Sequence, residues 1–291
     1  MAIIDPSYTP TDVHDVGLVI QGVLLDGNWV FGVAVYGSSA RVQASAVVNT
    51  RRENNSDIAD GLVVAPGIKS QTDVAAIIDE RSVVANNLRA GLLVVGGGAK
   101  SIDAKVGADV SLNAVGGIWA QGKGALLKLH GKARLSTNTL IGAGVTGGAR
   151  IEADGGRVDN TVPTNWAPVR SGAPQLTGAD GIGIFKGATG SLKGIKLDNL
   201  ARAGVIVDGG AKSAGGELDL VLKDVLFANS GFGVLINKGS PKSSAALQTA
   251  ASAAKGVDQP LKENAEVKVR VSACSQDDPA ASCAPLKPDQ G

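Results

Sequence analysis

The stretch Asn229-Ser230-Gly231-Phe232-Gly233-Val234-Leu235-Ile236 decides the fold, because its pattern returns along the chain. An Asn is followed four residues later by a Gly and then by a short apolar run. Copies occur at Asn28/Gly32, Asn87/Gly91, Asn113/Gly117 and Asn138/Gly142, with looser ones at Asn55/Gly61 and Asn199/Gly204 and one without the Asn at Gly181. Successive head glycines are 29, 30, 26, 25, 39, 23 and 29 residues apart. Such a period is typical of a stacked solenoid, in which each unit contacts only its neighbours.

Each unit is built from short strands. In the segment 204–209, the residues between the two bounding glycines are mostly β-branched and alternate over a few positions, which indicates a strand. A second strand is expected after the turn, as at 125–129 and 191–197. Parallel strands joined by helices would need crossovers of a dozen or more residues, and no such helical pattern is present. We therefore predict an all-β chain that winds as a single-stranded parallel β-helix of about eight coils.

The recurring Asn and Gly residues have an expected role at the corners of the coils. Asn tolerates the left-handed backbone conformation that a sharp corner requires. If the corners stack, the side-chain amide of one Asn can pair with that of the next coil. A second Gly follows each head, for example at Gly37, Gly122 and Gly209, and glycines at both ends of the short strand are expected to form the remaining corners.

The rhythm divides the chain into four parts. We expect an irregular lead-in over 1–15, the β-helix over 16–239, a long loop and a last strand over 240–273, and a Pro-rich tail over 274–291. The last strand is predicted at 266–271, where polar and apolar residues alternate. The longest unit, 142–181, is expected to project as a loop.

Charge and hydropathy exclude some classes of partner. The net charge is +1 without a block of like charge, so no nucleic acid is expected as a partner. The apolar runs are too short to span a bilayer. The N-terminus lacks the pattern of a secretory signal, which indicates either a cytoplasmic protein or an internal piece of a longer exported chain. The chain enters the repeat part-way through a unit and shows no polar cap, which favours the fragment.

The phrase Val47-Val48-Asn49-Thr50-Arg51-Arg52-Glu53-Asn54, followed by Asp60-Gly61-Leu62-Val63-Val64, resembles coils in the repeat regions of large bacterial surface proteins of the myxobacterial type. Those regions are right-handed parallel β-helices of the pectin-lyase-like superfold. The resemblance implies an extracellular or cell-surface location and supplies no shared catalytic motif. It favours a non-catalytic scaffold or adhesion module that binds polysaccharide or a surface protein on a flat solenoid face.

The alternative hypothesis is a polysaccharide-active enzyme, namely a lyase, glycoside hydrolase or epimerase, with a groove beside the 142–181 loop. β-Helical pectate lyases use carboxylates to hold calcium and an Arg or Lys as the base. The nearest set of such residues here is Arg150, Glu152, Asp154, Arg157 and Asp159. Strand alternation would put the first three on one face, although mixed charges there are also typical of a solvated surface. Trp166 in the same unit is a candidate for stacking on a sugar ring or for fixing the loop. Calcium is expected only under this alternative, and no other cofactor is expected.

Three other features resemble known sites. Gly96-Gly97-Gly98-Ala99-Lys100-Ser101 resembles a phosphate-binding loop, but Ala99 stands where that motif needs Gly. The same slot recurs at 209–213, so it is interpreted as a structural corner. His130-Gly131 resembles the His-Gly of polygalacturonases, whose other motif residues are not found. Cys274 and Cys283 are too few for a structural zinc site and are predicted to form a disulfide, with two free thiols as the alternative.

Overall fold

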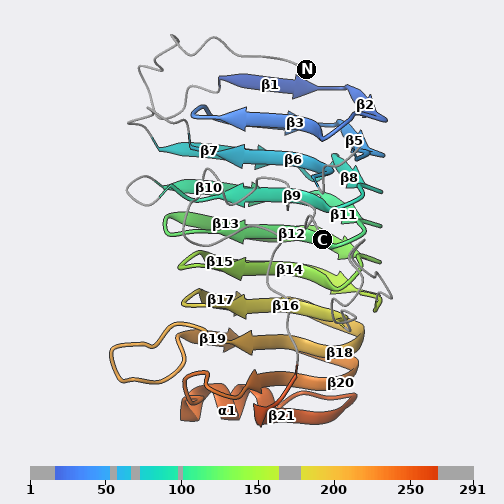
Figure 1. Ribbon diagram of the computed structural model, residues 1–291. Coiled ribbons are helices and arrows are strands. Elements are labelled where there is room, and N and C mark those ends of the chain that lie inside the picture. Colours follow the sequence, from blue (N-terminus) through green and yellow to red (C-terminus); the bar gives the residue numbers. More distant parts are fainter. Residues whose placement is uncertain (1–16, 53–57, 67–72, 98–100, 164–177, 268–291) are drawn as a thin grey trace, which may run out of the picture.

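The computed structural model describes residues 17–52, 58–66, 73–97, 101–163 and 178–267. Their strands stack as successive rungs along one axis, and every pairing between strands is parallel. Among the described residues from β1 to β20, no helix separates one strand from the next, so each turn of the chain adds a coil directly onto the one before (Figure 1). This confirms the predicted parallel β-helix.

The coils present three faces, named A, B and C, and the chain visits them in the repeated order B, C, A. Face A holds the strands that follow the head glycines, namely β3 (Phe31–Tyr36), β6 (Asp60–Ala65), β9 (Ala90–Val95), β12 (Gly116–Gln121), β14 (Ile141–Thr146), β16 (Asp180–Phe185), the later parts of β18 (Lys196–Asp208) and β20 (Leu226–Asn237), and β21 (Val257–Ala265).

Faces B and C follow the same stacking. Face B holds β1 (Leu18–Gln21), β4 (Ala40–Gln43), β7 (Val74–Ile78), β10 (Ile102–Val106), the first parts of β13 (Ala125–Ser136) and β15 (Arg150–Asp159), β17 (Thr189–Lys193) and β19 (Leu220–Lys223). Face C holds β2 (Leu24–Asp26), β5 (Ala46–Val48), β8 (Val83–Ala85), β11 (Asp109–Ser111), the later parts of β13 and β15, and the first parts of β18 and β20.

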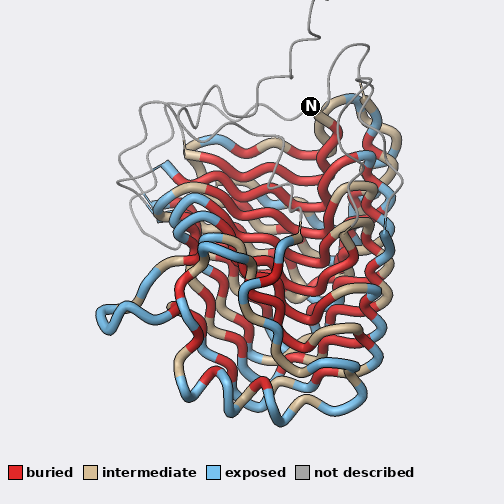
Figure 2. Tube along the Cα trace, turned by 60° about the horizontal axis from the view of Figure 1, so that its bottom comes forward, coloured by how far each residue is buried: buried red, intermediate tan, exposed pale blue. Residues whose placement is uncertain are grey.

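Apolar side chains on the inner side of the rungs form one continuous core along the axis. Buried residues accordingly recur from rung to rung along the stack (Figure 2). Leu62, Leu92 and Ile118 occupy equivalent inward positions on consecutive rungs of face A and are fully buried. The chain has few aromatic residues, and the core is accordingly built almost wholly from Val, Leu, Ile and Ala.

The head glycines stack in a single column on face A, as their spacing predicts. Their expected role as corners is wrong, because they lie in extended strand. A Cβ on Gly117 would lie 2.4 Å from the carbonyl oxygen of Gly142, and one on Gly61 would lie 2.7 Å from that of Gly91. Neighbouring rungs approach too closely at this column for any side chain. The second glycines do form corners, as Gly122 (φ 85°) and Gly209 (φ 65°) show.

The predicted pairing of Asn side chains between coils is confirmed in the middle of the stack. Asn87, Asn113 and Asn138 are fully buried on consecutive rungs. The Nδ2 of Asn87 donates to the Oδ1 of Asn113 at 2.9 Å, and the Nδ2 of Asn113 donates to the Oδ1 of Asn138 at 3.0 Å. Each Oδ1 also accepts the backbone N–H of the preceding Asn, at 3.1 Å in both cases. This inner ladder therefore satisfies buried polar groups that the sharp turn leaves open.

The predicted left-handed conformation falls on a different residue in these coils. Leu112 (φ 58°) and Thr137 (φ 53°) adopt it, one position before the ladder residues. In the last full coil, Asn229 itself is left-handed (φ 50°). The recurring Asn thus occurs at two neighbouring positions. At the first, its left-handed backbone forms the corner, and at the second, its side chain points into the stack.

The C-terminal end of the stack is covered by a helix, α1 (Ala245–Ser252). Ser244 caps it, because its side chain accepts the Leu247 N–H at 3.1 Å. Leu247 and Ala251 are buried, and the helix packs against β19 and β21. The sequence predicted a long loop here, so this part of the prediction is wrong for residues 245–252. In the part of the chain that the structure describes, no helix is long and apolar enough to cross a membrane.

The last strand that the structure describes lies before the predicted strand at 266–271. It is β21, which ends at Ala265, and Glu266 and Val267 follow it outside any strand. The segment 257–265 contains Pro260 and lacks clear alternation, so pairing with β20 decides its conformation rather than local pattern. A proline is tolerated there because an end rung needs hydrogen bonds on one side only. The expected lead-in, the tail and the rest of the predicted strand lie outside the described residues.

Candidate functional site

Three of the predicted site residues lie on the outer side of face B. Arg150, Glu152 and Asp154 alternate with the inward Ile151 and Ala153, as expected. The Arg150 Nε lies 3.0 Å from the Glu152 Oε1. Asp154 pairs with Lys193 of the next coil at 3.2 Å. All four charged side chains are more than a third exposed. Such pairs contribute little and are typical of a solvated surface.

The other two predicted residues lie around a corner. Gly155 (φ 85°) and Gly156 (φ 88°) turn the chain from face B to face C, so Arg157 and Asp159 point away from the first group. Asp159 is fully buried and ion-paired with Arg157, while the Arg134 Nε of the preceding coil lies 3.8 Å from it. The structure therefore does not bring the five residues together.

On face C, Arg157 and Asp159 belong to a charged cluster that includes the next coil. The Arg157 Nη2 donates to the Asp198 Oδ2 at 3.1 Å, and the Lys196 Nζ lies 2.8 Å from the same oxygen. The hydrogen bond from Lys196 and that from the Asn229 side chain hold the pKa of Asp198 below its usual value, against the opposing effect of burial. Asp198 is thus kept as a carboxylate.

Next to this cluster, three asparagines form a second, outer column at the corner after face C. Asn160, Asn199 and Asn229 follow one another on consecutive rungs, all left-handed. The Nδ2 of Asn199 donates to the Oδ1 of Asn160 at 2.6 Å. Asn160 and Asn229 also donate to the carboxylates beneath, Asp159 at 3.0 Å and Asp198 at 2.9 Å. The ion pairs on face C therefore fix the orientation of the column.

The outer asparagine column borders a hollow of about 670 Å³. Most of the other groups along it are small or polar, namely Thr137, Thr161, Ala201, Ser230, Gly231, Gly256 and Asp258, and the rest are the apolar Val162, Pro163 and Leu200. In the described part of the chain, the Oδ1 atoms of Asn199 and Asn229 accept no hydrogen bond. Both side chains are exposed. The hollow thus offers amide groups to a ligand at a regular spacing, on a base held in place by ion pairs.

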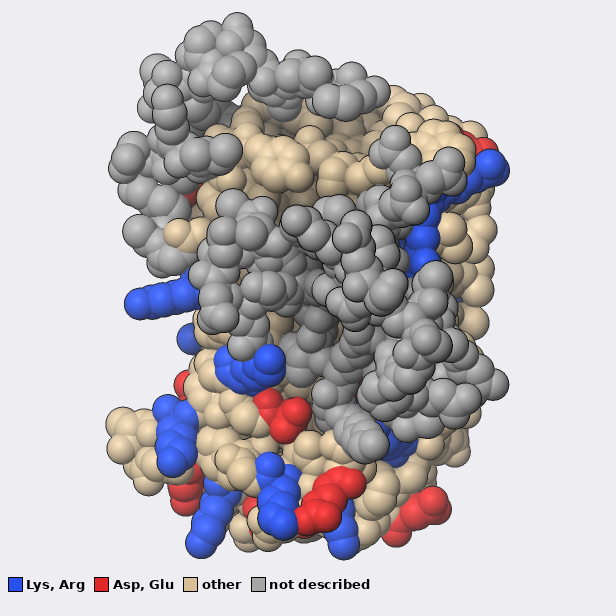
Figure 3. Space-filling view, in the orientation of Figure 1, with Lys and Arg blue, Asp and Glu red and all other residues tan. Residues whose placement is uncertain are grey.

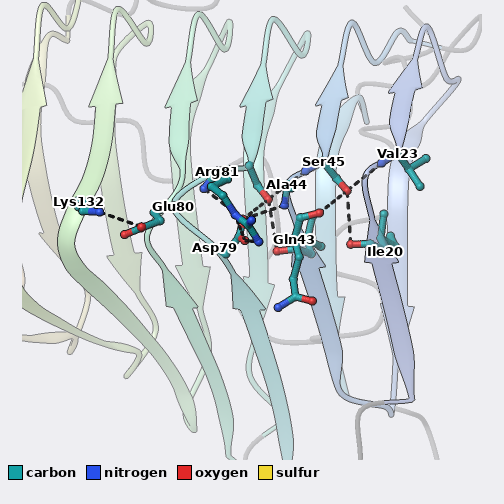
Figure 4. Close-up of polar contacts among 11 residues, drawn as sticks. Ile20, Val23, Gln43, Ala44, Ser45, Asp79, Glu80, Arg81 and Lys132 are labelled. Carbon is teal, nitrogen blue, oxygen red and sulfur yellow. Dashed lines mark hydrogen bonds and ion pairs between the residues drawn. The ribbon is translucent and has the colours of Figure 1, made fainter.

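A different polar cluster occupies the corner between faces B and C near the N-terminal end (Figure 4). The Asp79 Oδ1 accepts the Ala44 N–H at 3.0 Å and the Ser82 hydroxyl at 2.6 Å. Hydrogen bonds from Ser82, Ala44 and Arg81 lower the pKa of Asp79, although burial, the largest single effect, acts to raise it. These hydrogen bonds all join residues of the same corner, so the cluster around Asp79 has a structural role.

Charge elsewhere is mixed. Figure 3 shows Lys and Arg interleaved with Asp and Glu over the lower part of the view, without a large area of one sign. The described residues contain no group of three or more His, Cys, Asp or Glu side chains placed to hold a metal ion. Trp166, Cys274 and Cys283 lie outside the described residues, so the predictions made for them stay predictions.

Sequence reasoning missed Asp198, Lys196 and the outer asparagine column as a group. Asn199 and Asn229 were recognised only as repeat markers. Asn160 was hidden because the long 142–181 unit separates it from its head glycine. If residues had been counted from the first strand of each unit and not back from the next head glycine, Asn160, Asn199 and Asn229 would have fallen at the same position of their units.

The sequence matches no protein-family model and no curated protein. Among solved structures it is similar to pectate lyase Pel9A, with a TM-score of 0.46 and 11% sequence identity. The similarity covers 84% of this chain and 62% of that one, so this chain spans less than two thirds of the lyase's length. At this identity the likeness concerns the fold alone. By its own strand pairing, the chain is a parallel β-helix.

Proposed function

We propose that this chain is a non-catalytic, extracellular β-helix module that binds polysaccharide in the hollow beside Asn160, Asn199 and Asn229. The observation that carries the proposal is the asparagine column, in which the exposed Asn199 and Asn229 leave their acceptor oxygens unused along a hollow large enough for sugar rings. The location outside the cell is part of the proposal and is supported by the resemblance to bacterial surface repeats.

The chemistry of the column suits hydroxyl groups. A side-chain amide offers both donors and an acceptor, as a sugar hydroxyl also does. Consecutive rungs are about 4.8 Å apart, close to the length of one sugar residue in an extended polymer. Asn160, Asn199 and Asn229 would therefore meet successive residues of a chain lying along the solenoid axis.

The neighbouring carboxylates support a binding role rather than catalysis. Asp159 is buried against Arg157, and Asp198 is shared between Arg157 and Lys196. A general acid must hold a proton near neutral pH, whereas the pKa of Asp198 is lowered. These carboxylates orient the asparagines through the hydrogen bonds that they accept.

The test compares two double variants at equivalent corner positions. Asn199→Gly/Asn229→Gly removes the amides at the hollow, and Asn49→Gly/Asn86→Gly removes them from the same column far up the stack. Glycine tolerates the left-handed backbone at each site. Binding to a panel of neutral and uronic-acid polysaccharides is measured by calorimetry. Loss of two hydrogen bonds at about 1 kcal/mol each should weaken binding roughly 30-fold at the hollow only.

Equal binding by both double variants would refute the proposed site. The enzyme alternative is tested in the same panel by following the 4,5-unsaturated product with and without calcium. If the chain forms this product, and Arg150→Ala or Arg157→Ala abolishes the turnover, then the chain is a lyase and not a non-catalytic binding module.

A further inference from the structure

The carboxylates below the outer asparagine column fix how its amides are turned. A carboxylate only accepts hydrogen bonds, so the Nδ2 of Asn160 must face Asp159 and the Nδ2 of Asn229 must face Asp198. Asp159 is ion-paired with Arg157, and the lowered pKa of Asp198 keeps that group ionised as well. Neither amide can therefore rotate to exchange its nitrogen and oxygen without losing its bond to the carboxylate.

The orientation passes from Asn160 to the next rung. Because the Nδ2 of Asn160 faces Asp159, its Oδ1 is turned toward Asn199 and accepts the Nδ2 of that residue at 2.6 Å. Asn199 and Asn229 thus each use an N–H within the protein, while their Oδ1 atoms accept no hydrogen bond from the described residues. The Ser230 hydroxyl also donates inside the protein, to the Ala228 carbonyl at 3.1 Å. The side chains along the hollow are therefore left with more acceptors than donors.

The charge of the hollow has one sign. Among the described residues that line it, Asp258 is the charged one, and none is Lys, Arg or His. Asp258 is exposed and makes no ion pair or side-chain hydrogen bond with the described part of the chain. The cations of face C do not offset it, because Arg157 and Lys196 are both paired with Asp198. A ligand in the hollow therefore meets an uncompensated negative charge.

The strand register places Asp258 beside an open part of the hollow. Ser230 pairs with Val257 and Phe232 with Gln259, so Asp258 lies next to Gly231 on the last rung. Gly231 carries no side chain, and Ala201, which lines the hollow on the rung before, carries only a methyl group. Three rungs away, Val162 is 38% exposed and offers an apolar surface. The hollow thus runs for roughly 14 Å from an apolar end to a carboxylate.

We propose that the ligand of this hollow is a neutral, hydroxyl-rich sugar chain, and that Asp258 makes the hollow reject uronic acids. The inference rests on the binding function proposed above and names its substrate class. Sugar hydroxyls donate to the unused Oδ1 atoms of Asn199 and Asn229 and to the Asp258 carboxylate, where the bond is strengthened by charge. The carboxylates of a uronic-acid chain only accept, so they meet acceptors and a like charge. Such a repulsive element gives a binding site its specificity.

The test uses the full chain and matched pairs of sugar chains. Hexasaccharides of galacturonate, mannuronate and glucuronate are each compared with the carboxyl-reduced form, which keeps the linkages and replaces every carboxylate with a primary hydroxyl. Calorimetry is expected to show a reduced form that binds, with its parent acid at least about tenfold weaker. Added salt should narrow this difference, because it screens the repulsion between exposed charges.

Two carboxylate variants assign the discrimination to one residue. Asp258→Asn removes the charge at nearly constant shape, and should strengthen binding of the acid about fivefold while weakening binding of the reduced form about twofold. The control is Glu217→Gln, which changes the net charge equally at an exposed site between faces A and B. It should alter neither affinity. Asn199→Gly/Asn229→Gly is measured alongside to show that binding takes place in the hollow.

The results separate this inference from the binding function on which it rests. If an acid binds as tightly as its reduced form, and Asn199→Gly/Asn229→Gly weakens both, the hollow binds polysaccharide but the substrate class is wrong. An unchanged difference between acid and reduced form in Asp258→Asn would remove Asp258 as its cause. If neither form binds in any pair, the substrate class and the binding function are both refuted.

Discussion

Replacement of Asn113 by Ala tests whether the inner asparagine ladder stabilises the stack. The Asn113 Oδ1 accepts the backbone N–H of Asn87 at 3.1 Å and its Nδ2 at 2.9 Å. The Asn138 Oδ1 keeps the backbone N–H of residue 113 as a donor, so it is not left unpaired. The variant therefore leaves two buried donors of Asn87 without a partner. At about 1–3 kcal/mol for each, the free energy of unfolding should fall by roughly 2–6 kcal/mol.

The matched control is Thr50→Val, which lies in the same column on the rung before that of Asn87. The Thr50 Oγ1 is buried and has no hydrogen-bond partner among the described residues, so removing it should leave stability unchanged or raise it by up to about 1 kcal/mol. Urea unfolding followed by circular dichroism gives both values, and amide exchange reports on the Asn87 N–H directly. A loss below about 1 kcal/mol in Asn113→Ala, or retained protection of that amide, would refute the reasoning.

Three further predictions concern the glycine column, the outer corner and pH. Gly117→Ala should destabilise the chain by at least about 2 kcal/mol, because its Cβ would meet the Gly142 carbonyl, while Gly107→Ala, with its nearest atom at 3.4 Å, should be almost neutral in thermal unfolding. Leu112→Asn should stabilise by about 1 kcal/mol, because an exposed Leu with φ 58° is strained and Asn is not; Leu112→Ala, which keeps the strain, should not. The folded-state pKa of Asp198 is lowered from 3.8, so its contribution is present above that pH and is lost as pH falls through the folded value. Asp198→Asn should therefore lose less stability on acidification than the wild type. The pKa of Asp180 is raised, so its contribution to stability is present below pH 3.8 and is lost as pH rises through the folded value. Asp180→Asn should therefore show the opposite difference from the wild type. Equal acid titrations for the two variants would contradict both assignments.

The sequence by itself determined the architecture. Gly117 and its equivalents recur because neighbouring rungs approach so closely that only glycine fits, and this requirement is local to each coil. Short alternating strands without helices between them leave few folds open. The same local reasoning found that Arg150, Glu152 and Asp154 share a face, because strand alternation fixes the direction of each side chain.

Only the tertiary structure decided which residues meet. The corner at Gly155 and Gly156 separates Arg157 from Arg150, although the two are only seven positions apart. Asp198 joins Arg157 from the next coil, 41 positions away. Such contacts depend on the register between rungs, and the loop lengths that set this register vary from coil to coil. Alternation fixes the side of the strand on which a residue lies, whereas stacking fixes its neighbours above and below, and the candidate site is made of those neighbours.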